Sequence, residues 1–316
     1  MNYRISVVLP VYKSEKYIQN CLKSIVEQTY PPYEIILVSD GCVDKSIVIA
    51  KEYLDNLDIK FDIIEQSNQG VASARNNGIS RANGDWVIAI DSDDCIYPHT
   101  FEILMNNVSD ENVLAIDFAT NQPREIEPIV TNEDIVSIDG IEAMNNYYGR
   151  KYKFVSPALM IKRSFLIENN IKYDVGCLFA EDDIYVWKIL CKTNKLLYIK
   201  KPLYNYIFHS SSTMTTSNID KFYSVKQFSE DLDSIYIQKS YNACDIKNLI
   251  LYRHYIGLIH VAAKVQTYED FKNLIVYYDM KELYNKRKNT FGFYNKIFFR
   301  LPLICPFLVY ILFKYR

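Results

Sequence analysis

Glycine is scarce in this chain of 316 residues: there are nine glycines, and the first stands at position 41. No glycine-rich loop follows the first apolar run, residues 5–11, and no G-x-G-x-x-G pattern occurs. Both absences disfavour a dinucleotide-binding oxidoreductase. They also disfavour a nucleotidyltransferase acting on sugar phosphates, because such enzymes usually carry a glycine-rich loop after the first strand.

Closely spaced cysteine pairs are also absent. Seven cysteines are scattered along the chain: Cys21, Cys42, Cys95, Cys177, Cys191, Cys244 and Cys305. Their odd number and the lack of C-x-x-C spacing argue against a disulfide framework and a zinc site, so we expect reduced thiols in the cytosol. The apolar run at residues 5–11 lacks a signal-peptide cleavage site and ends at Lys13, so we interpret it as a buried strand.

The chain has little net charge and no long apolar run. The formal net charge of −2 gives no indication of nucleic-acid binding. Residues 301–313 are uncharged and largely apolar, but a membrane span needs about 20 such residues. From Lys281 onward, eight Lys or Arg stand against one acidic residue. We expect a segment lying on a membrane surface, held by basic flanks; a helix packed on the protein is the alternative.

What the sequence does contain is an alternation of strand and helix patterns. Strand patterns at residues 5–11, 34–39, 61–65 and 85–90 alternate with helical patterns at 18–26, 45–57 and 71–82. This order predicts an α/β fold, with a mostly parallel central sheet and helices on both faces. Further along, we expect a loop at 121–133, a strand at 155–161, a helix opening at 180–183, extended segments at 196–199 and 203–208, and helices from about residue 220.

Acidic residues follow the fourth predicted strand. Asp91 and Asp93 are two apart on an extended segment, so their side chains point the same way. Two carboxylates at a strand end form a hard oxygen site for Mg²⁺ or Mn²⁺, which neutralises a leaving diphosphate. Asp94 adds charge or orients its neighbours. Such acids are also common as helix caps or solvated loop residues, so the pattern is weak by itself.

Ligands of parallel sheets bind beyond the carboxyl ends of the strands, and two more candidates occupy such positions. Asp40, before Gly41, could accept a hydrogen bond from a nucleobase or a ribose hydroxyl, or could simply form an Asp-Gly turn. Arg75 could bind phosphate oxygens, or could be an ordinary surface cation of a helix. The first strand ends at residues 10–12, which are placed at the same edge.

A second acidic cluster lies far from the first in sequence. Glu181, Asp182 and Asp183 open a helix, where one carboxylate could act as a general base; equally, three acids could favour a helix N-terminus through its dipole. His209 and Ser212 lie in a polar segment suited to phosphate or metal contact, or in a Ser-rich turn.

These patterns together resemble the family 2 inverting glycosyltransferases of the GT-A fold. The resemblance covers about the first 110 residues well and extends weakly to about 215. It is carried by SVVLPVY at 6–12, CLKSI at 21–25, QTY at 28–30, EIILVSDG at 34–41, NQG at 68–70, ARN at 74–76, GDW at 84–86 and DSDD at 91–94. The sequence departs from the family at Ser39, where an acid is usual, at Lys13, where Asn is usual, and at His209, where Arg is common.

The resemblance implies a role for each matching residue. Asp182 would be the catalytic base and Glu181 would lie at the acceptor. The metal ligands would be Asp91, Asp93 and His209, with Mn²⁺ or Mg²⁺ as the cofactor. The nucleotide-sugar site would comprise Pro10, Val11, Tyr12, Asp40, Arg75, Asp91, Ser92, His209 and Ser212.

The resemblance also implies an activity and a place in the cell. We expect transfer of a sugar from a nucleotide-diphosphate donor, a UDP-sugar, to a glycan or lipid-linked oligosaccharide acceptor in bacterial surface polysaccharide synthesis. The protein would be cytoplasmic, peripheral on the inner face of the cell membrane. We expect a glycosyltransferase domain at 1–215, divided at 110 into nucleotide-binding and acceptor halves, then a helical region at 216–316. A non-catalytic glycan-binding protein on this fold is the other alternative, although the intact acids argue against it.

Overall fold

A computed structural model of the chain describes residues 3–123, 128–148, 151–177, 181–209, 267–277, 281, 285 and 300–314. The chain divides into two compact units. The first unit comprises Met1–Gly176 and Glu181–His209, and the second comprises Cys177–Ala180 and Ser210–Arg316. Each unit is described by itself. The expected helices from 220 to 266 lie outside the described residues. The predicted domain boundaries are not tested by the structure and stay predictions.

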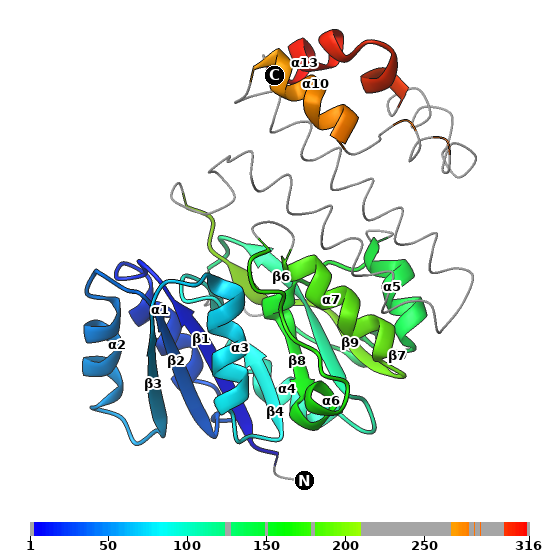
Figure 1. The fold of residues 1–316 in the computed structure, drawn as a ribbon. Coiled ribbons are helices and arrows are strands. Elements are labelled where there is room, and N and C mark those ends of the chain that lie inside the picture. The colour runs from blue at the N-terminus through cyan, green and yellow to red at the C-terminus, as the bar shows by residue number, and fades with distance from the viewer. Residues whose placement is uncertain are drawn as a thin grey trace. The chain divides into compact units, whose positions relative to one another are not determined.

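A nine-stranded sheet forms the centre of the first unit (Figure 1), in the order β3-β2-β1-β4-β8-β6-β9-β5, with β7 paired to β9. The strands are β1 Ile5–Val11, β2 Glu34–Asp40, β3 Phe61–Gln66, β4 Trp86–Ala89, β5 Cys95–Ile96, β6 Val113–Thr120, β7 Ile135–Ile138, β8 Leu159–Lys162 and β9 Leu196–Tyr206.

The first four strands of the chain are parallel neighbours, because β1 pairs in parallel with β2 and β4, and β2 with β3. Strand β8 is antiparallel to both β4 and β6, so β6 runs in the same direction as β4. Every residue of β1 and β2 is buried, so both faces of this part of the sheet are covered. The predicted mostly parallel sheet with surrounding helices is confirmed.

In the described residues of the first unit, the strands are connected by seven α-helices: α1 Ile18–Val26, α2 Ser46–Leu54, α3 Val71–Arg81, α4 Thr100–Asn107, α5 Gly140–Tyr148, α6 Arg163–Glu168 and α7 Glu181–Lys192. Helix α3 lies against β1, β2, β3 and β4. Its Gly78 allows a very close approach, because a Cβ there would come within 2.3 Å of Val8 Cγ1. Helix α3 is therefore packed tightly against the sheet.

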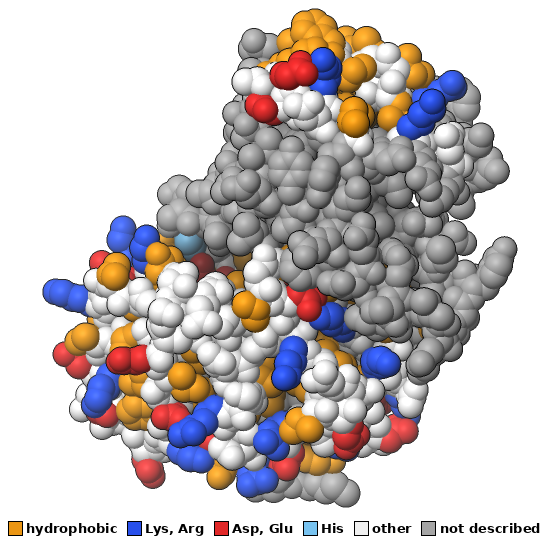
Figure 2. Space-filling model, in the orientation of Figure 1, with side chains coloured by type: hydrophobic (Ala, Val, Ile, Leu, Met, Phe, Trp, Pro, Cys, Tyr) orange, Lys and Arg blue, Asp and Glu red, His pale blue; other side chains and the backbone are white. Residues whose placement is uncertain are grey.

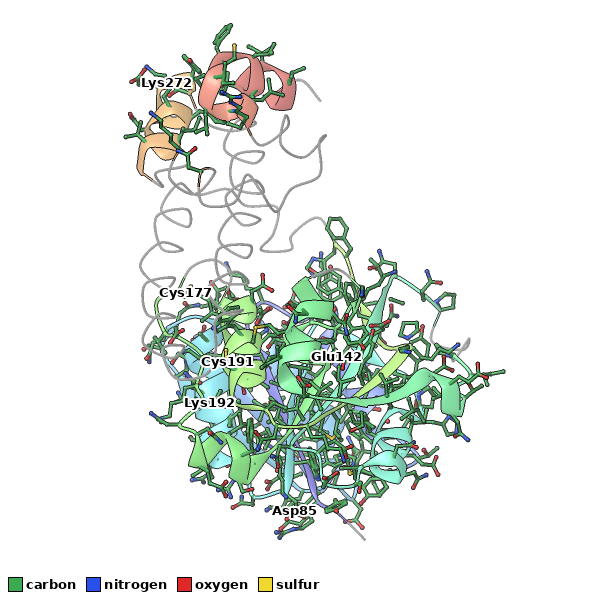
Figure 3. All side chains as sticks on the ribbon, turned by 90° about the vertical axis from the view of Figure 1, so that its right-hand side faces the viewer. Asp85, Glu142, Cys177, Cys191, Lys192 and Lys272 are labelled. Carbon is green, nitrogen blue, oxygen red and sulfur yellow. The ribbon has the colours of Figure 1, made fainter. Side chains whose placement is uncertain are left out.

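Helices α5 and α7 pack side by side, as the labelled Glu142 and Cys191 indicate in Figure 3. A Cβ at Gly140 would lie 2.3 Å from the carbonyl oxygen of Leu190, so the start of α5 touches the end of α7. On the face shown in Figure 2, Lys and Arg are interspersed with Asp and Glu over the described surface. None of the described cysteines forms a disulfide.

Two expectations about strands were wrong in detail. The predicted strand at 155–161 begins only at Leu159, since Ser156–Ala158 form a 3₁₀ turn that contains Pro157. The two extended segments at 196–199 and 203–208 are a single strand, β9, whose register against β6 shifts around Asp117.

In the second unit the structure describes helices α10, Tyr268–Tyr277, and α13, Pro306–Lys314. They pack through aromatic rings: Tyr310 lies 5.6 Å from Phe271 and 5.5 Å from Tyr268 between ring centroids. Among the residues described here, no helix combines the length and apolar character that crossing a bilayer requires.

Candidate active site

Three carboxylates follow β4 at the sheet edge where the parallel strands end. Strand β4 is buried throughout, and a turn closed by the Asp94 N–H on the Asp91 carbonyl, at 3.0 Å, follows it directly. Asp91, Asp93 and Asp94 therefore project from one turn at the carboxyl end of the sheet, where the sequence placed them. The expected extended segment was wrong: the chain turns here, and Asp91 and Asp93 contact different partners, Arg75 and His209.

Arg75 joins this turn to the second acidic cluster. Its Nη2 donates to Asp91 Oδ1 at 2.6 Å, and its Nη1 donates to Asp182 Oδ1 at 2.5 Å. Asp91 and Asp182, 91 positions apart in sequence, are thus separated by the width of one guanidinium. The Arg75 side chain is 2% exposed, so it is not the surface cation that the sequence allowed as an alternative.

The aromatic ring of Tyr173 packs against the Arg75 guanidinium. The Cζ atom of Arg75 lies 5.1 Å from the centre of the Tyr173 ring, within the range of cation–π attraction. The next residue of α3, Asn76, exchanges two hydrogen bonds with the backbone of Tyr173, at 2.8 and 2.9 Å. Helix α3 therefore fixes both the cation and the ring on which it rests.

The Asp182 carboxyl group is set up to titrate near neutrality. Removal from water and the charges of Glu181 and Asp91 raise its pKa to about 7, against the opposing attraction of Arg75. Burial also raises the pKa of Glu181. The third acid, Asp183, accepts a hydrogen bond from the Tyr147 hydroxyl at 2.7 Å. A carboxyl group with a pKa near 7 is well matched to general-base chemistry.

His209 contacts the acidic turn at Asp93, whereas Arg75 contacts it at Asp91. Its Nε2 is 2.8 Å from Asp93 Oδ2, and its ring stacks on Tyr17 with centroids 4.5 Å apart and an interplanar angle of 17°. Burial and the neighbouring Asp91 raise the pKa of Asp93, while His209 opposes this. His209 and Asp93, predicted to act together, are therefore neighbours.

Asp94 holds the chain segment that carries His209. Its Oδ2 accepts from the Tyr204 hydroxyl at 2.6 Å, and its Oδ1 from the Ile207 N–H at 2.7 Å. Burial and Asp91 raise the pKa of Asp94 to about 8. The suggestion that Asp94 orients neighbours matches this placement.

Comparison with known proteins bears on the chemistry of this arrangement. The family model described as "Glycosyl transferase family 2" matches residues 6–180, more than half of the chain. The chain belongs to glycosyl transferase family 2.

This family 2 chain is similar to EpsH of Bacillus subtilis, with 33% identity over 216 residues, which are 66% of this chain and 62% of EpsH. The matched region thus spans less than two thirds of that relative.

Two solved structures share the fold. A crystal structure of Staphylococcus aureus TarS residues 1–349 in complex with UDP-GlcNAc has a TM-score of 0.74 at 18% identity, covering 99% of this chain and 90% of that one. The mannosyltransferase PcManGT of Pyrobaculum calidifontis, in complex with GDP-Man and Mn²⁺, has a TM-score of 0.57 at 14% identity, covering 100% and 84%.

The predicted metal ligands of this family 2 chain are placed unequally. Asp93 and His209 meet, whereas Asp91 is engaged by Arg75. Within the described ranges, no three His, Cys, Asp or Glu side chains are grouped so as to hold a metal ion unaided. A carboxylate oxygen and an imidazole nitrogen nevertheless suit Mn²⁺, which commonly takes its remaining ligands from phosphate oxygens and water. The donor set fits a cation shared with a diphosphate.

Asp40 is more enclosed than the predicted contact with a nucleobase suggests. The residue is 4% exposed, and its carboxylate accepts hydrogen bonds from the N–H groups of Gln69, at 2.8 Å, and Gly70, at 3.0 Å. It therefore fixes the loop that leads into α3, where Gly70 takes a φ of 87°. Recognition of the base by Asp40 stays a prediction.

The remaining predicted residues lie at the end of β1 or beside it. Pro10 and Val11 end the strand, and Tyr12 is exposed. Lys13 adopts a φ of 52°, a conformation that Asn, usual in the family, accepts more readily. Ser92 is buried against the Ser14 hydroxyl at 2.6 Å and so ties the acidic turn to the loop after β1. Ser212 lies outside the described residues.

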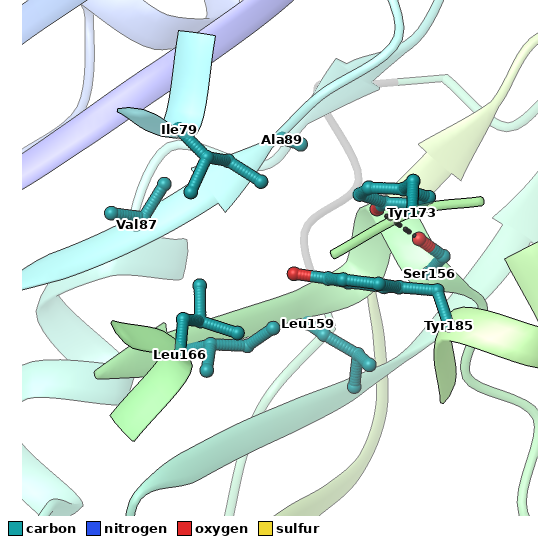
Figure 4. Close-up of a pocket in the computed structure, with 9 residues that line it drawn as sticks. Ile79, Val87, Ala89, Ser156, Leu159, Leu166, Tyr173 and Tyr185 are labelled. Atoms are coloured by element: carbon teal, nitrogen blue, oxygen red, sulfur yellow. Dashed lines mark hydrogen bonds between the residues drawn. The ribbon is translucent and has the colours of Figure 1, made fainter. Parts of the chain in front are cut away.

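Sequence reasoning missed the two aromatic supports of the site, Tyr17 and Tyr173. Among 27 tyrosines, spacing gives no signal for either. Tyr173 also stacks on Tyr185 at 3.6 Å, beside a small cavity that Figure 4 shows lined by both rings and by apolar side chains such as Val87 and Leu166. The Tyr173 hydroxyl reaches Ser156 Oγ at 2.5 Å.

Proposed function

We propose that this family 2 protein transfers a sugar from a UDP-sugar to a hydroxyl of a glycan or glycolipid acceptor, with inversion and with a divalent cation as cofactor. The observation that carries the proposal is the position of Asp182 beside Asp91, bridged by Arg75. One carboxylate is thus available as a base beside the acidic turn, and inversion by a single displacement requires such a base on the side opposite the leaving group.

The contacts support the roles that we propose. Asp182 takes the proton from the acceptor hydroxyl as that oxygen attacks the anomeric carbon, and the diphosphate leaves from the opposite side. Asp93 and His209 would hold Mn²⁺ or Mg²⁺, which when bound would supply positive charge for the diphosphate. Glu181, in the first turn of α7 beside Asp182, faces the acceptor.

The donor and the pathway are proposed by likeness. The solved TarS structure contains UDP-GlcNAc, and TarS is named a poly(ribitol-phosphate) β-N-acetylglucosaminyltransferase. We infer a UDP-sugar donor for this chain and a place in the synthesis of a bacterial surface polysaccharide. The peripheral location at the inner face of the membrane is part of the same proposal.

A screen of nucleotide sugars for cation-dependent hydrolysis tests the proposal. We expect release of UDP from one UDP-sugar with Mn²⁺ or Mg²⁺ and little release with EDTA. Asp93→Ala should lose cation-dependent UDP binding in calorimetry, while Asp62→Ala, on the exposed surface, should keep it. Unchanged UDP affinity of Asp93→Ala with Mn²⁺ would refute the metal assignment, and hydrolysis of no nucleotide sugar would refute the activity.

A further inference from the structure

The guanidinium of Arg75 donates hydrogen bonds to two carboxylates that have different roles in the proposed reaction. Nη2 is committed to Asp91 and Nη1 to Asp182, and the buried Nε has no hydrogen-bond partner among the described residues. A planar guanidinium imposes a fixed spacing on the groups it bridges, which an ammonium cannot do.

We propose that Arg75 is a positioning residue, which sets the Asp182 carboxylate at a fixed distance and angle from Asp91 and thereby aligns the base with the donor. This inference rests on the proposed function and deepens it. It differs from the implied role of Arg75, direct contact with the donor's base or phosphates, because here Arg75 acts through Asp182.

The support around Arg75 is rigid, as a positioning role requires. Helix α3 is pressed onto the sheet at Gly78, and Tyr173 packs under the guanidinium while Asn76 fixes the Tyr173 backbone. Asp182 stands in the first turn of α7. The hydrogen bond from Arg75 restrains its carboxylate.

Several charged groups of the described residues act on Asp182, and Arg75 is the positive one among them. The groups that act on it are Arg75 from α3, Asp91 from the acidic turn, and Glu181 and Asp183 from its own helix. Without Arg75, three acids would repel the Asp182 carboxylate. Its position would change as well as its charge, so a misplaced base is the expected consequence.

Two substitutions separate positioning from donor binding. Arg75→Lys keeps a cation but cannot bridge both carboxylates, so we expect kcat for transfer to fall about 10- to 100-fold, the scale of a misplaced catalytic group. The dissociation constant for UDP with Mn²⁺ should change less than about threefold. Arg81→Lys, on the same helix but at the exposed surface, is the matched control and should behave as wild type.

A double-substitution cycle tests whether Arg75 acts through Asp182. If it does, Arg75→Lys should add little to the residual rate of Asp182→Asn, because the group being positioned is already disabled. Fully additive losses would overturn the inference. So would a large loss of UDP affinity with unchanged kcat, which would make Arg75 a donor contact.

A readout without turnover keeps this inference separate from the proposed function. Titration of ¹³C-labelled aspartate carboxyls by NMR should show a higher Asp182 pKa in Arg75→Gln than in wild type, with the fold checked by circular dichroism. An unchanged Asp182 titration would overturn the pairing. A raised pKa in a protein that hydrolyses no nucleotide sugar would leave the pairing intact and refute the activity instead.

Discussion

Tyr17 and His209, 192 positions apart in sequence, stack with ring centroids 4.5 Å apart and planes inclined by 17°. Tyr17 precedes α1, whose first residue is Ile18, while His209 follows β9. The tyrosine ring covers one face of the imidazole, and Asp93 meets its Nε2 edge. His209 is therefore held in the plane in which it would share a cation with Asp93.

The first prediction concerns this support. Tyr17→Ala should weaken UDP binding in the presence of Mn²⁺ by about 3- to 10-fold, because His209 must then be ordered on binding; stacked aromatic pairs contribute about 0.5–1.5 kcal/mol. Binding of UDP without metal should change little. Calorimetry measures both, with Tyr33→Ala at the exposed surface as the control. Equal loss with and without metal would contradict the role given to His209.

The second prediction concerns the base. Asp182→Asn preserves the size of the side chain but cannot accept the proton, so transfer should fall at least about a hundredfold while UDP binding persists. Asp183→Asn is the matched neighbour in the same turn and should retain most activity, since Asp183 is engaged by Tyr147. Near-normal turnover of Asp182→Asn in a coupled UDP-release assay would place the base elsewhere.

The third prediction is a pH dependence. Because the pKa of Asp182 is raised to about 7, the ionised base is present above that pH and is lost as pH falls through it. We expect kcat/KM, which reports the free enzyme, to fall about tenfold per unit once pH is well below 7. Initial rates between pH 5 and 9 measure this. A flat profile down to pH 5 would show that Asp182 does not titrate as described.

The first strands of the fold could be predicted because β1 and β2 are buried on both faces. Such strands carry continuous apolar runs, as Ile5–Val11 and Glu34–Asp40 illustrate, and helical patterns separate them. Strand β7, Ile135–Ile138, was missed because it is short and only partly buried, without an apolar run to reveal it. Strand β6, Val113–Thr120, was also missed, although its first four residues are buried and apolar.

The site was only partly predictable. Strand-end rules place Asp91 and Asp93 at the sheet edge without any knowledge of the family. They do not bring Asp182 to Asp91, because that proximity depends on how α7 packs after 90 intervening residues; it came from resemblance alone. Nothing in the sequence distinguishes Tyr173 from other tyrosines, since its role arises from the backbone hydrogen bonds made by Asn76.

The fourth prediction uses the cavity beside Tyr173. The Tyr185 hydroxyl is buried without a hydrogen-bond partner in the described part of the chain, whereas the Tyr173 hydroxyl reaches Ser156 (Figure 4). Tyr185→Phe should therefore leave the free energy of unfolding equal or raise it by about 1 kcal/mol, and Tyr173→Phe should lower it by about 1 kcal/mol. Urea unfolding of the two variants, compared by their midpoints with the m-value unchanged, tests this prediction. Marked destabilisation by Tyr185→Phe would mean that a buried water satisfies the hydroxyl.

The last prediction concerns the apolar surface of α13. Phe307, Leu308 and Leu312 of α13 are exposed, as is Ile304 just before the helix, while Val309 and Tyr310 are buried. The spacing is helical, and from Lys281 onward basic residues outnumber acidic ones, which fits an anionic lipid surface.

Replacing Phe307 and Leu312 by Ser should reduce sedimentation with vesicles containing phosphatidylglycerol about tenfold or more, because both side chains lose apolar area that would leave water. Val276→Ser, an exposed apolar residue on α10, is the matched control and should sediment as wild type. Raising the salt concentration should weaken binding of the wild type, since the basic residues contribute. If the double variant still sediments fully with the vesicles, α13 does not bind the membrane. If neutral vesicles bind the wild type equally well, the basic residues do not contribute to membrane binding.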